Sequence, residues 1–152
     1  MTIKRLLIAY YTGEGGTKKM ADAIGKGAEG KGVDVKVIRI EECGLNDLVE
    51  ADGIILGSPT YFSNVAWQVK KVIDESIALY DGHQLSDKVG GCFTSSGTLR
   101  DGKDCIRMLE LAFGLHHRLK MVPGIIRVSG DGEEEVSEKC QRYGMAIAKE
   151  LL

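Results

Sequence analysis

Residues 12–17 combine glycines and hydroxyls at a place where an apolar run leads into helical periodicity. Three glycines let the backbone approach a ligand closely, and two threonines add hydroxyl donors. The first N–H groups of a helix have no internal acceptor, and the helix dipole favours negative charge beside them. The segment therefore predicts a phosphate site made by Thr12, Gly13, Glu14, Gly15, Gly16 and Thr17. The alternative is an ordinary turn in which Thr17 is the N-cap of the helix.

Two common nucleotide motifs do not fit this segment. A Walker loop requires Gly-Lys-Ser/Thr, which occurs nowhere in the chain, and a dinucleotide fingerprint requires Gly-x-Gly-x-x-Gly between a strand and a helix. Counted from Gly13, the third glycine position of that fingerprint holds Lys18. The spacing does occur at Gly25, Gly27 and Gly30, but these residues lie in the second half of an expected helix. We therefore interpret that match as a helix end and turn.

Two more loops carry groups suited to a flat polar ring. One follows the apolar run 53–58 and places two adjacent aromatics beside an amide; its candidate residues are Pro59, Thr60, Tyr61, Phe62 and Asn64. The other follows the run 88–95 and offers hydroxyls with few charges; its candidate residues are Thr94, Ser95, Ser96, Gly97 and Thr98. Such groups can hydrogen-bond the edge of a neutral heterocycle. Alternatively, the aromatics cap the core and the second loop is a plain turn.

The elements that must position these loops alternate along the chain. Strand-like runs cover residues 6–11, 33–38, 53–58, 88–95 and 121–128, and helical periodicity covers 17–29, 45–50, about 66–80, the region of 106–116, and 136–151. The strands lack in–out alternation, which is typical of a parallel sheet with helices on both faces. Ligands of such α/β sheets bind beyond the carboxyl ends of the strands. We therefore expect all three loops at one edge of a three-layer, doubly wound, five-stranded sheet.

Composition excludes several classes of protein. The chain has 152 residues, and 20 Lys plus Arg against 22 Asp plus Glu give a net charge of −2. Nucleic-acid binding depends on concentrated Lys and Arg, so no nucleic-acid partner is expected. No apolar run approaches the ~20 residues of a membrane span, and the first run is too short for a signal sequence. The four cysteines form no Cys-x-x-Cys pair, so no metal site is expected. We expect one cytoplasmic domain over residues 1–152, without membrane contact.

The three loops resemble those of the flavodoxin superfamily, and the resemblance covers essentially the whole chain. Residues 11–17 resemble its FMN phosphate loop, whose usual form is Ser/Thr-x-Thr-Gly-x-Thr. Residues 57–64, Gly-Ser-Pro-Thr-Tyr-Phe-Ser-Asn, and residues 95–98 are similar to the Trp-repressor-binding-protein type of NAD(P)H:quinone oxidoreductases and FMN reductases. This resemblance implies a flavodoxin-like sheet with strand order 2-1-3-4-5, with FMN as cofactor.

The same resemblance implies that His116 or His117, near the end of the fourth helix, approaches the flavin, with His116 as the candidate catalytic residue. The alternative is that both are helix C-terminal histidines favoured by the dipole. The implied activity is an oxidoreductase that passes electrons from NAD(P)H or a redox-protein donor to a quinone-like acceptor, with a homodimer as the expected assembly. A flavodoxin-type electron carrier without its own substrate, or a scaffold that has lost its cofactor, are the alternatives.

Three departures from the family pattern bear on these expectations. Glu14 places a carboxylate where threonine is usual, beside the expected phosphate, so either Lys18 or Lys19 compensates or FMN affinity falls. Leu99 and Arg100 replace the glycines that usually follow the third loop, which alters access to the ring. The chain also lacks room for the insertion that is linked to tetramer formation in these quinone reductases.

Overall fold

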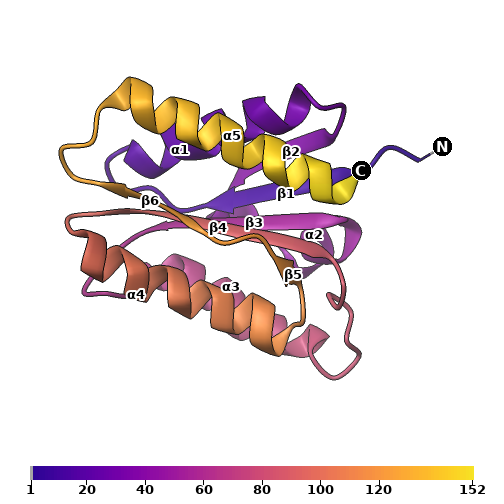
Figure 1. Ribbon diagram of the computed structural model, residues 1–152. Coiled ribbons are helices and arrows are strands. Elements are labelled where there is room, and N and C mark those ends of the chain that lie inside the picture. Colours follow the sequence, from indigo (N-terminus) through magenta and orange to yellow (C-terminus); the bar gives the residue numbers. More distant parts are fainter. Residues whose placement is uncertain (1) are drawn as a thin grey trace.

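The computed structural model describes residues 2–152, which form a parallel sheet between two layers of helices (Figure 1). The strands are β1 (Arg5–Tyr10), β2 (Asp34–Arg39), β3 (Gly53–Pro59), β4 (Val89–Ser96), β5 (Lys120–Met121) and β6 (Ile125–Val128). They follow the order β2-β1-β3-β4-β5, and β6 also pairs with β4. All strand pairings are parallel. The predicted α/β fold and its strand order are confirmed.

The helices divide between the two faces of the sheet. One face is covered by α1 (Gly16–Glu29) and α5 (Glu133–Leu151), and the other by α2 (Leu45–Glu50), α3 (Trp67–Glu75) and α4 (Leu99–Glu110). Figure 1 shows α1 and α5 above the sheet and α3 and α4 below it. Short segments of other helix types extend these elements: η1 (Ile40–Glu42), η2 (Ser76–Leu79) and the π-helical η3 (Leu111–His116). No helix within residues 2–152 is both long and apolar enough to cross a membrane.

Strand β1 illustrates why the predicted strands lack in–out alternation. Its side chains alternate between two buried clusters, because successive residues of a strand point to opposite faces. Leu6, Ile8 and Tyr10 join the cluster under α1 and α5. Leu7 and Ala9 join the cluster under α2, α3 and α4. Both faces are therefore buried from Leu6 onward, so every position after the exposed Arg5 is apolar.

Helices α1 and α5 pack at very close range through glycines. A Cβ atom at Gly27 would overlap the carbonyl oxygen of Gln141, and one at Gly144 would overlap the carbonyl oxygen of Ile24. The Gly-x-Gly-x-x-Gly spacing at residues 25–30 thus lies within and just after α1, as predicted, and Gly27 serves helix packing. This contact fixes the start of α1, which carries the first candidate loop, relative to α5.

The prediction of one continuous strand over residues 121–128 is wrong. The segment forms two short strands, of which β5 pairs with the first two residues of β4 and β6 pairs with its last four. Pro123 separates them, because proline has no N–H to donate to the sheet. The next N–H, that of Gly124, donates to Glu110 Oε2 over 3.2 Å and not to a strand.

Two predicted helices differ from the structure at their ends. The third gives way after Glu75 to the 3-10 turn η2, which ends at Leu79. The fourth starts at Leu99, seven residues before the first apolar position that marked it, and ends in η3. Its N-cap is Thr98, whose Oγ1 accepts a hydrogen bond from Asp101 N over 3.2 Å. The third candidate loop therefore leads directly into a helix.

Candidate functional site

The three predicted loops meet at one edge of the sheet, where β4 leads into α4 and β6 leads toward α5 (Figure 1). Tyr11 N donates to the Gly57 carbonyl oxygen over 3.0 Å, and Thr60 N donates to the Ser95 carbonyl oxygen over 2.8 Å. The loops line a cavity of about 440 Å³. Its lining residues are Thr12, Gly13, Glu14, Gly15, Gly16, Thr17, Lys19, Pro59, Tyr61, Ser95 and Arg127. The predicted meeting of the three loops is present in the fold.

The first loop presents backbone N–H groups without acceptors. Gly15 has φ 97°, in the left-handed region that favours glycine, and its own N–H donates to Thr12 Oγ1 over 2.8 Å. Within residues 2–152 no hydrogen-bond acceptor is present for the N–H groups of Gly13, Glu14, Gly16 and Thr17. All four residues line the cavity. Donors of this kind at the start of a helix suit a phosphate dianion.

Thr17 joins the first loop to the third. Its Oγ1 lies 3.0 Å from Ser95 Oγ, and its side chain is almost wholly buried. The residue that caps α1 is Gly15, so the alternative in which Thr17 is the N-cap is wrong. The hydroxyl of Thr17 instead sets how far the start of α1 lies from the end of β4.

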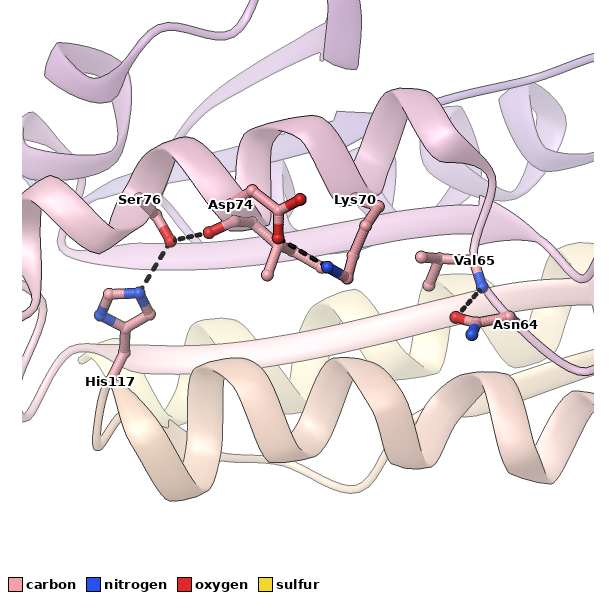
Figure 2. Close-up of polar contacts among 7 residues, drawn as sticks. Asn64, Val65, Lys70, Asp74, Ser76 and His117 are labelled. Atoms are coloured by element: carbon pink, nitrogen blue, oxygen red, sulfur yellow. Dashed lines mark hydrogen bonds and ion pairs between the residues drawn. The ribbon is translucent and has the colours of Figure 1, made fainter.

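The second loop is a tight turn with an aromatic tip. Tyr61 N donates to the Asn64 carbonyl oxygen over 2.9 Å and Asn64 N donates back to the Tyr61 carbonyl oxygen over 3.0 Å. The two residues between them, Phe62 and Ser63, have φ 51° and 64°, which side chains rarely adopt. Figure 2 shows Asn64 Oδ1 accepting the N–H of Val65, over 2.8 Å. The amide of Asn64 thus shapes this turn.

The aromatics of this turn do not cap the core. Phe62 is fully exposed and Tyr61 is 45% exposed, so the core-capping alternative is wrong. Tyr61 leans toward the first loop, because a Cβ at Gly13 would lie 2.6 Å from its hydroxyl oxygen. Partial burial, together with the nearby Tyr11 and Glu14, raises the pKa of Tyr61 above its ordinary value. Tyr61 therefore stays a neutral phenol beside the cavity.

Most hydroxyls of the third loop are used within the protein. Thr94 is fully buried and its Oγ1 lies 2.7 Å from Thr60 Oγ1, which ties the second loop to the third. Ser96 Oγ donates to the Thr98 carbonyl oxygen over 2.7 Å, and Thr98 Oγ1 caps α4. Gly97, in contrast, is exposed, and a Cβ there would meet no atom within 4 Å. Close approach of a ligand is therefore open at Gly97, while the neighbouring hydroxyls position the backbone.

One residue of the cavity was not predicted from the sequence. Arg127, on β6, is half-buried, and a Cβ at Gly16 would lie 2.8 Å from its Nη1. The sequence could have indicated Arg127 by its position near the carboxyl end of the last strand. In the structure it pairs with Ser95 in the parallel register. Glu14, whose charge was expected to oppose a phosphate, is exposed. A cation therefore lies against the first residue of α1 on the inner side of the loop.

The structure places His116 and His117 at the opposite edge of the sheet. They follow α4 and come just before Lys120, which pairs with the first residue of β4. His116 is exposed, and the buried His117 has its Nε2 2.8 Å from Ser76 Oγ. Figure 2 shows this pair at one end of α3 and Asn64 at the other. The expectation that either histidine approaches the ligand is not met within this chain, because α4 carries them the length of the sheet away from the loops.

A larger hollow of about 720 Å³ lies at that opposite edge. Its charged lining residues are of both signs: Lys4, Lys88 and Lys120, with Asp52, Asp87 and Glu150. Lys88 Nζ donates to the carbonyl oxygens of Val49 and Ala51, so it joins two parts of the fold. The described residues 2–152 contain no group of three His, Cys, Asp or Glu side chains able to hold a metal ion. The 440 Å³ cavity therefore remains the candidate site, since it brings the three predicted loops together.

Comparison with known proteins bears on the chemistry of this cavity. The family model of NADPH-dependent FMN reductases matches residues 5–133. The NAD(P)H dehydrogenase (quinone) of Sinorhizobium fredii is 30% identical over 138 residues, which cover 78% of this chain and 69% of that protein. A flavodoxin of Clostridium saccharobutylicum is 33% identical over 127 residues, covering 83% of this chain and 73% of that protein. Among solved structures, a WrbA-like flavodoxin from Agrobacterium tumefaciens matches with a TM-score of 0.84 at 30% identity, covering 97% of each chain.

Proposed function

Because the chain belongs to the family of NADPH-dependent FMN reductases, we propose that it is an FMN-dependent oxidoreductase which takes electrons from NAD(P)H and passes them to a quinone-like acceptor. The observation that carries this proposal is the cavity at the carboxyl edge of the sheet. It is lined by four backbone N–H groups that have no acceptor in residues 2–152 and by Tyr61 of the aromatic turn, and the exposed Gly97 follows two residues after its lining residue Ser95. FMN has a phosphate dianion at one end and a flat polar ring at the other, so the N–H groups suit its phosphate and the aromatic turn suits its ring.

The residues divide into those that bind and those that position. The N–H groups of the first loop would bind the phosphate. The exposed aromatics Tyr61 and Phe62 would lie along one side of the ring, and the backbone around Gly97 would approach its polar edge. Thr17 and Thr94 would position the loops, because their hydroxyls are hydrogen-bonded to those of Ser95 and Thr60.

FMN, when bound, supplies the redox chemistry, in which the hydride of NAD(P)H and one proton from solvent together convert a quinone to a hydroquinone. The contribution of this chain is to bind and orient. His116 lies at the other edge of the sheet, so no histidine of this chain is assigned to proton transfer in the cavity. The hydroquinone monoanion, a phenolate, that results from hydride addition to the quinone would therefore take its one proton from water.

The test begins with the purified protein and added FMN. We expect FMN to bind with quenched fluorescence, and the bound FMN to be bleached by NADPH or NADH under anaerobic rapid mixing. Addition of benzoquinone should then restore the absorbance, with one quinone consumed for each reduced nicotinamide oxidised. The Gly15→Val variant is the matched control, because valine is strained at φ 97° and should disturb the loop. Absence of FMN binding, or FMN binding without reduction by either nicotinamide, would reject the proposal.

An electron carrier without its own substrate is the second candidate. The similarity to a flavodoxin of Clostridium saccharobutylicum supports it. A carrier should accept electrons one at a time from dithionite, with two separate steps in the titration, and should turn over slowly with NAD(P)H and a quinone. The oxidoreductase should instead take up two electrons in a single step and should turn over rapidly with NAD(P)H and a quinone. The same rapid-mixing experiment, with a dithionite titration beside it, therefore separates the two.

We also propose that residues 1–152 act as one FMN-binding domain in the cytoplasm, and that two copies form a homodimer. The four cysteines are unpaired thiols, which is typical of a reducing compartment. Light scattering after size-exclusion chromatography, with and without FMN, tests the assembly. A single species with the mass of one chain in both conditions would reject the homodimer.

A further inference from the structure

The charges of the first loop do not by themselves favour a phosphate. Glu14 lies in the middle of the loop as an exposed carboxylate. The two lysines that follow are both engaged elsewhere: Lys18 pairs with Asp22 over 2.8 Å, and Lys19 pairs with Glu133 over 3.1 Å. The positive charge of each lysine, which was expected to offset the negative charge of Glu14, therefore also offsets that of Asp22 or Glu133. A further positive charge beside this loop would add to the attraction of its N–H groups for a dianion.

Arg127 reaches the loop because of the pleat of β6. Successive side chains of a strand point to opposite faces. Ile125 packs into the cluster under α1 and α5, whereas Ile126 packs into the cluster on the other face. Arg127 therefore lies on the α1 side, and the pairing of Ser95 with Arg127 sets it level with the ends of the neighbouring strands. The start of α1 lies at that level.

The guanidinium of Arg127 lies against the loop backbone, and it helps Lys19 to lower the pKa of the nearby Glu133 without itself forming an ion pair with that carboxylate. Its Nη1 would be 2.8 Å from a Cβ at Gly16, the first residue of α1. It forms no ion pair and no side-chain hydrogen bond with any residue in the described range 2–152. Five N–H donors in a half-buried position normally find acceptors. Here the acceptors that fit are the oxygens of an anion in the cavity, which Arg127 lines together with the loop.

We propose that Arg127 adds to the loop N–H groups a second phosphate-binding group, which strengthens the preference of this site for a phosphorylated flavin over an unphosphorylated one. The inference rests on the proposed function, since it takes FMN as the ligand of the cavity. A guanidinium matches two phosphate oxygens at once, and such charge-assisted pairs are stronger than neutral hydrogen bonds. Riboflavin has the same ring and lacks the phosphate, so Arg127 adds affinity for FMN alone. Arg127 is a binding residue that determines specificity, and it takes no part in the electron transfer.

The test compares the affinities of FMN and riboflavin for the apoprotein, measured by fluorescence titration. We expect Arg127→Gln to weaken FMN binding between about ten- and a hundredfold, and to leave riboflavin binding unchanged. Arg127→Lys should lie between wild type and Arg127→Gln, because it keeps the charge and loses the paired geometry. Arg142→Gln is the matched control, since Arg142 is an exposed arginine on α5. Added salt should weaken FMN binding to wild type more than to Arg127→Gln.

The outcomes distinguish a failure of the role of Arg127 from a failure of FMN as the proposed cofactor. If wild type prefers FMN and Arg127→Gln keeps that preference in full, the role of Arg127 is rejected while the proposed cofactor stands. If wild type binds neither flavin, the proposed function fails and the role of Arg127 fails with it. Unchanged riboflavin affinity in Arg127→Gln shows that the ring site is intact. If Arg127→Gln fails to fold, Arg127→Lys decides the question. If Arg127→Lys keeps the full wild-type preference for FMN over riboflavin, together with the full salt dependence of FMN binding, the bidentate pairing is rejected.

Discussion

Thr17 Oγ1 lies 3.0 Å from Ser95 Oγ, so the first turn of α1 is hydrogen-bonded to the carboxyl end of β4. The two residues are 78 positions apart in the sequence, and Thr17 is only 2% exposed. Each belongs to a different loop of the candidate site. This partly buried pair of hydroxyls therefore helps to set the spacing between the phosphate loop and the ring loop.

Replacing Thr17 by valine removes this hydrogen bond and nearly preserves the shape. A hydrogen bond between neutral groups contributes about 1 kcal/mol to stability, so we expect T17V to lower the free energy of unfolding by about that amount. FMN binding should weaken several-fold because the loop loses its link to β4. Urea unfolding and FMN titration measure the two effects, and Thr2→Val, at an exposed position, is the control. If T17V matches wild type in both measurements, the hydroxyl pair does not position the site.

Two glycines of the misleading fingerprint should respond in opposite ways to alanine. At Gly27 the added Cβ would overlap the backbone carbonyl of Gln141, so overpacking should cost about 1–3 kcal/mol. At Gly30 the backbone has φ −60° and the nearest atom lies 3.6 Å from the added Cβ. We expect Gly30→Ala to be neutral or to stabilise by roughly 0.4–1 kcal/mol. Thermal and urea unfolding of both variants check this. Equal effects would show that helix packing is not the reason for Gly27.

Replacing Phe62 by alanine should weaken FMN binding without changing the stability of the fold. Its side chain is fully exposed, so Phe62→Ala should change the free energy of unfolding by less than about 0.5 kcal/mol. If its ring lies along the flavin, FMN affinity should fall by roughly 2- to 12-fold, the equivalent of an aromatic pair. Ile77→Ala, at an exposed position in η2, is the matched control and should alter neither quantity. Unchanged FMN affinity in Phe62→Ala would remove Phe62 from the binding site.

His117 predicts a pH dependence of stability. Burial lowers its pKa below the ordinary 6.5, so the unfolded chain takes up a proton at a higher pH than the folded chain. The stability that comes from keeping His117 neutral is fully present above about pH 6.5. It is lost as the pH falls through the lower pKa that His117 has in the folded chain. We expect His117→Gln to lose less stability than wild type between about pH 8 and about pH 5. Urea unfolding at several pH values measures this.

The exposed neighbour His116 supplies the comparison for that experiment, because its charge adds to burial in lowering the pKa of His117. His116→Gln should therefore reduce the wild-type pH dependence without abolishing it, since burial and the contact with Ser76 remain. The rings of Tyr80 and Phe113 pack against that of His117, and His83 packs against Tyr80. A His117→Gln profile parallel to that of wild type would show that another group titrates.

The elements and the three loops could be predicted from local patterns. Apolar runs and helical spacing are short-range properties, and they located every strand and helix to within a few residues except around Pro123 and at the start of α4. The positive φ at Gly15 likewise follows from local backbone preference, whereas the turn at residues 61–64 does not, because Phe62 and Ser63 adopt φ angles that side chains rarely take. Once a parallel sheet is inferred, the meeting of the loops at its carboxyl edge follows from topology.

The order of elements, the edge that carries the site and the residue types of its loops could all be inferred from the sequence. Which side chains face the cavity, in contrast, depends on the packing of the folded chain. The register of β6 brings Arg127 to α1, the length of α4 takes His116 away, and distant partners occupy the hydroxyls of Thr17 and Thr94. These outcomes depend on contacts between residues far apart in the chain, where a shift of one position in a strand reverses the face of every side chain.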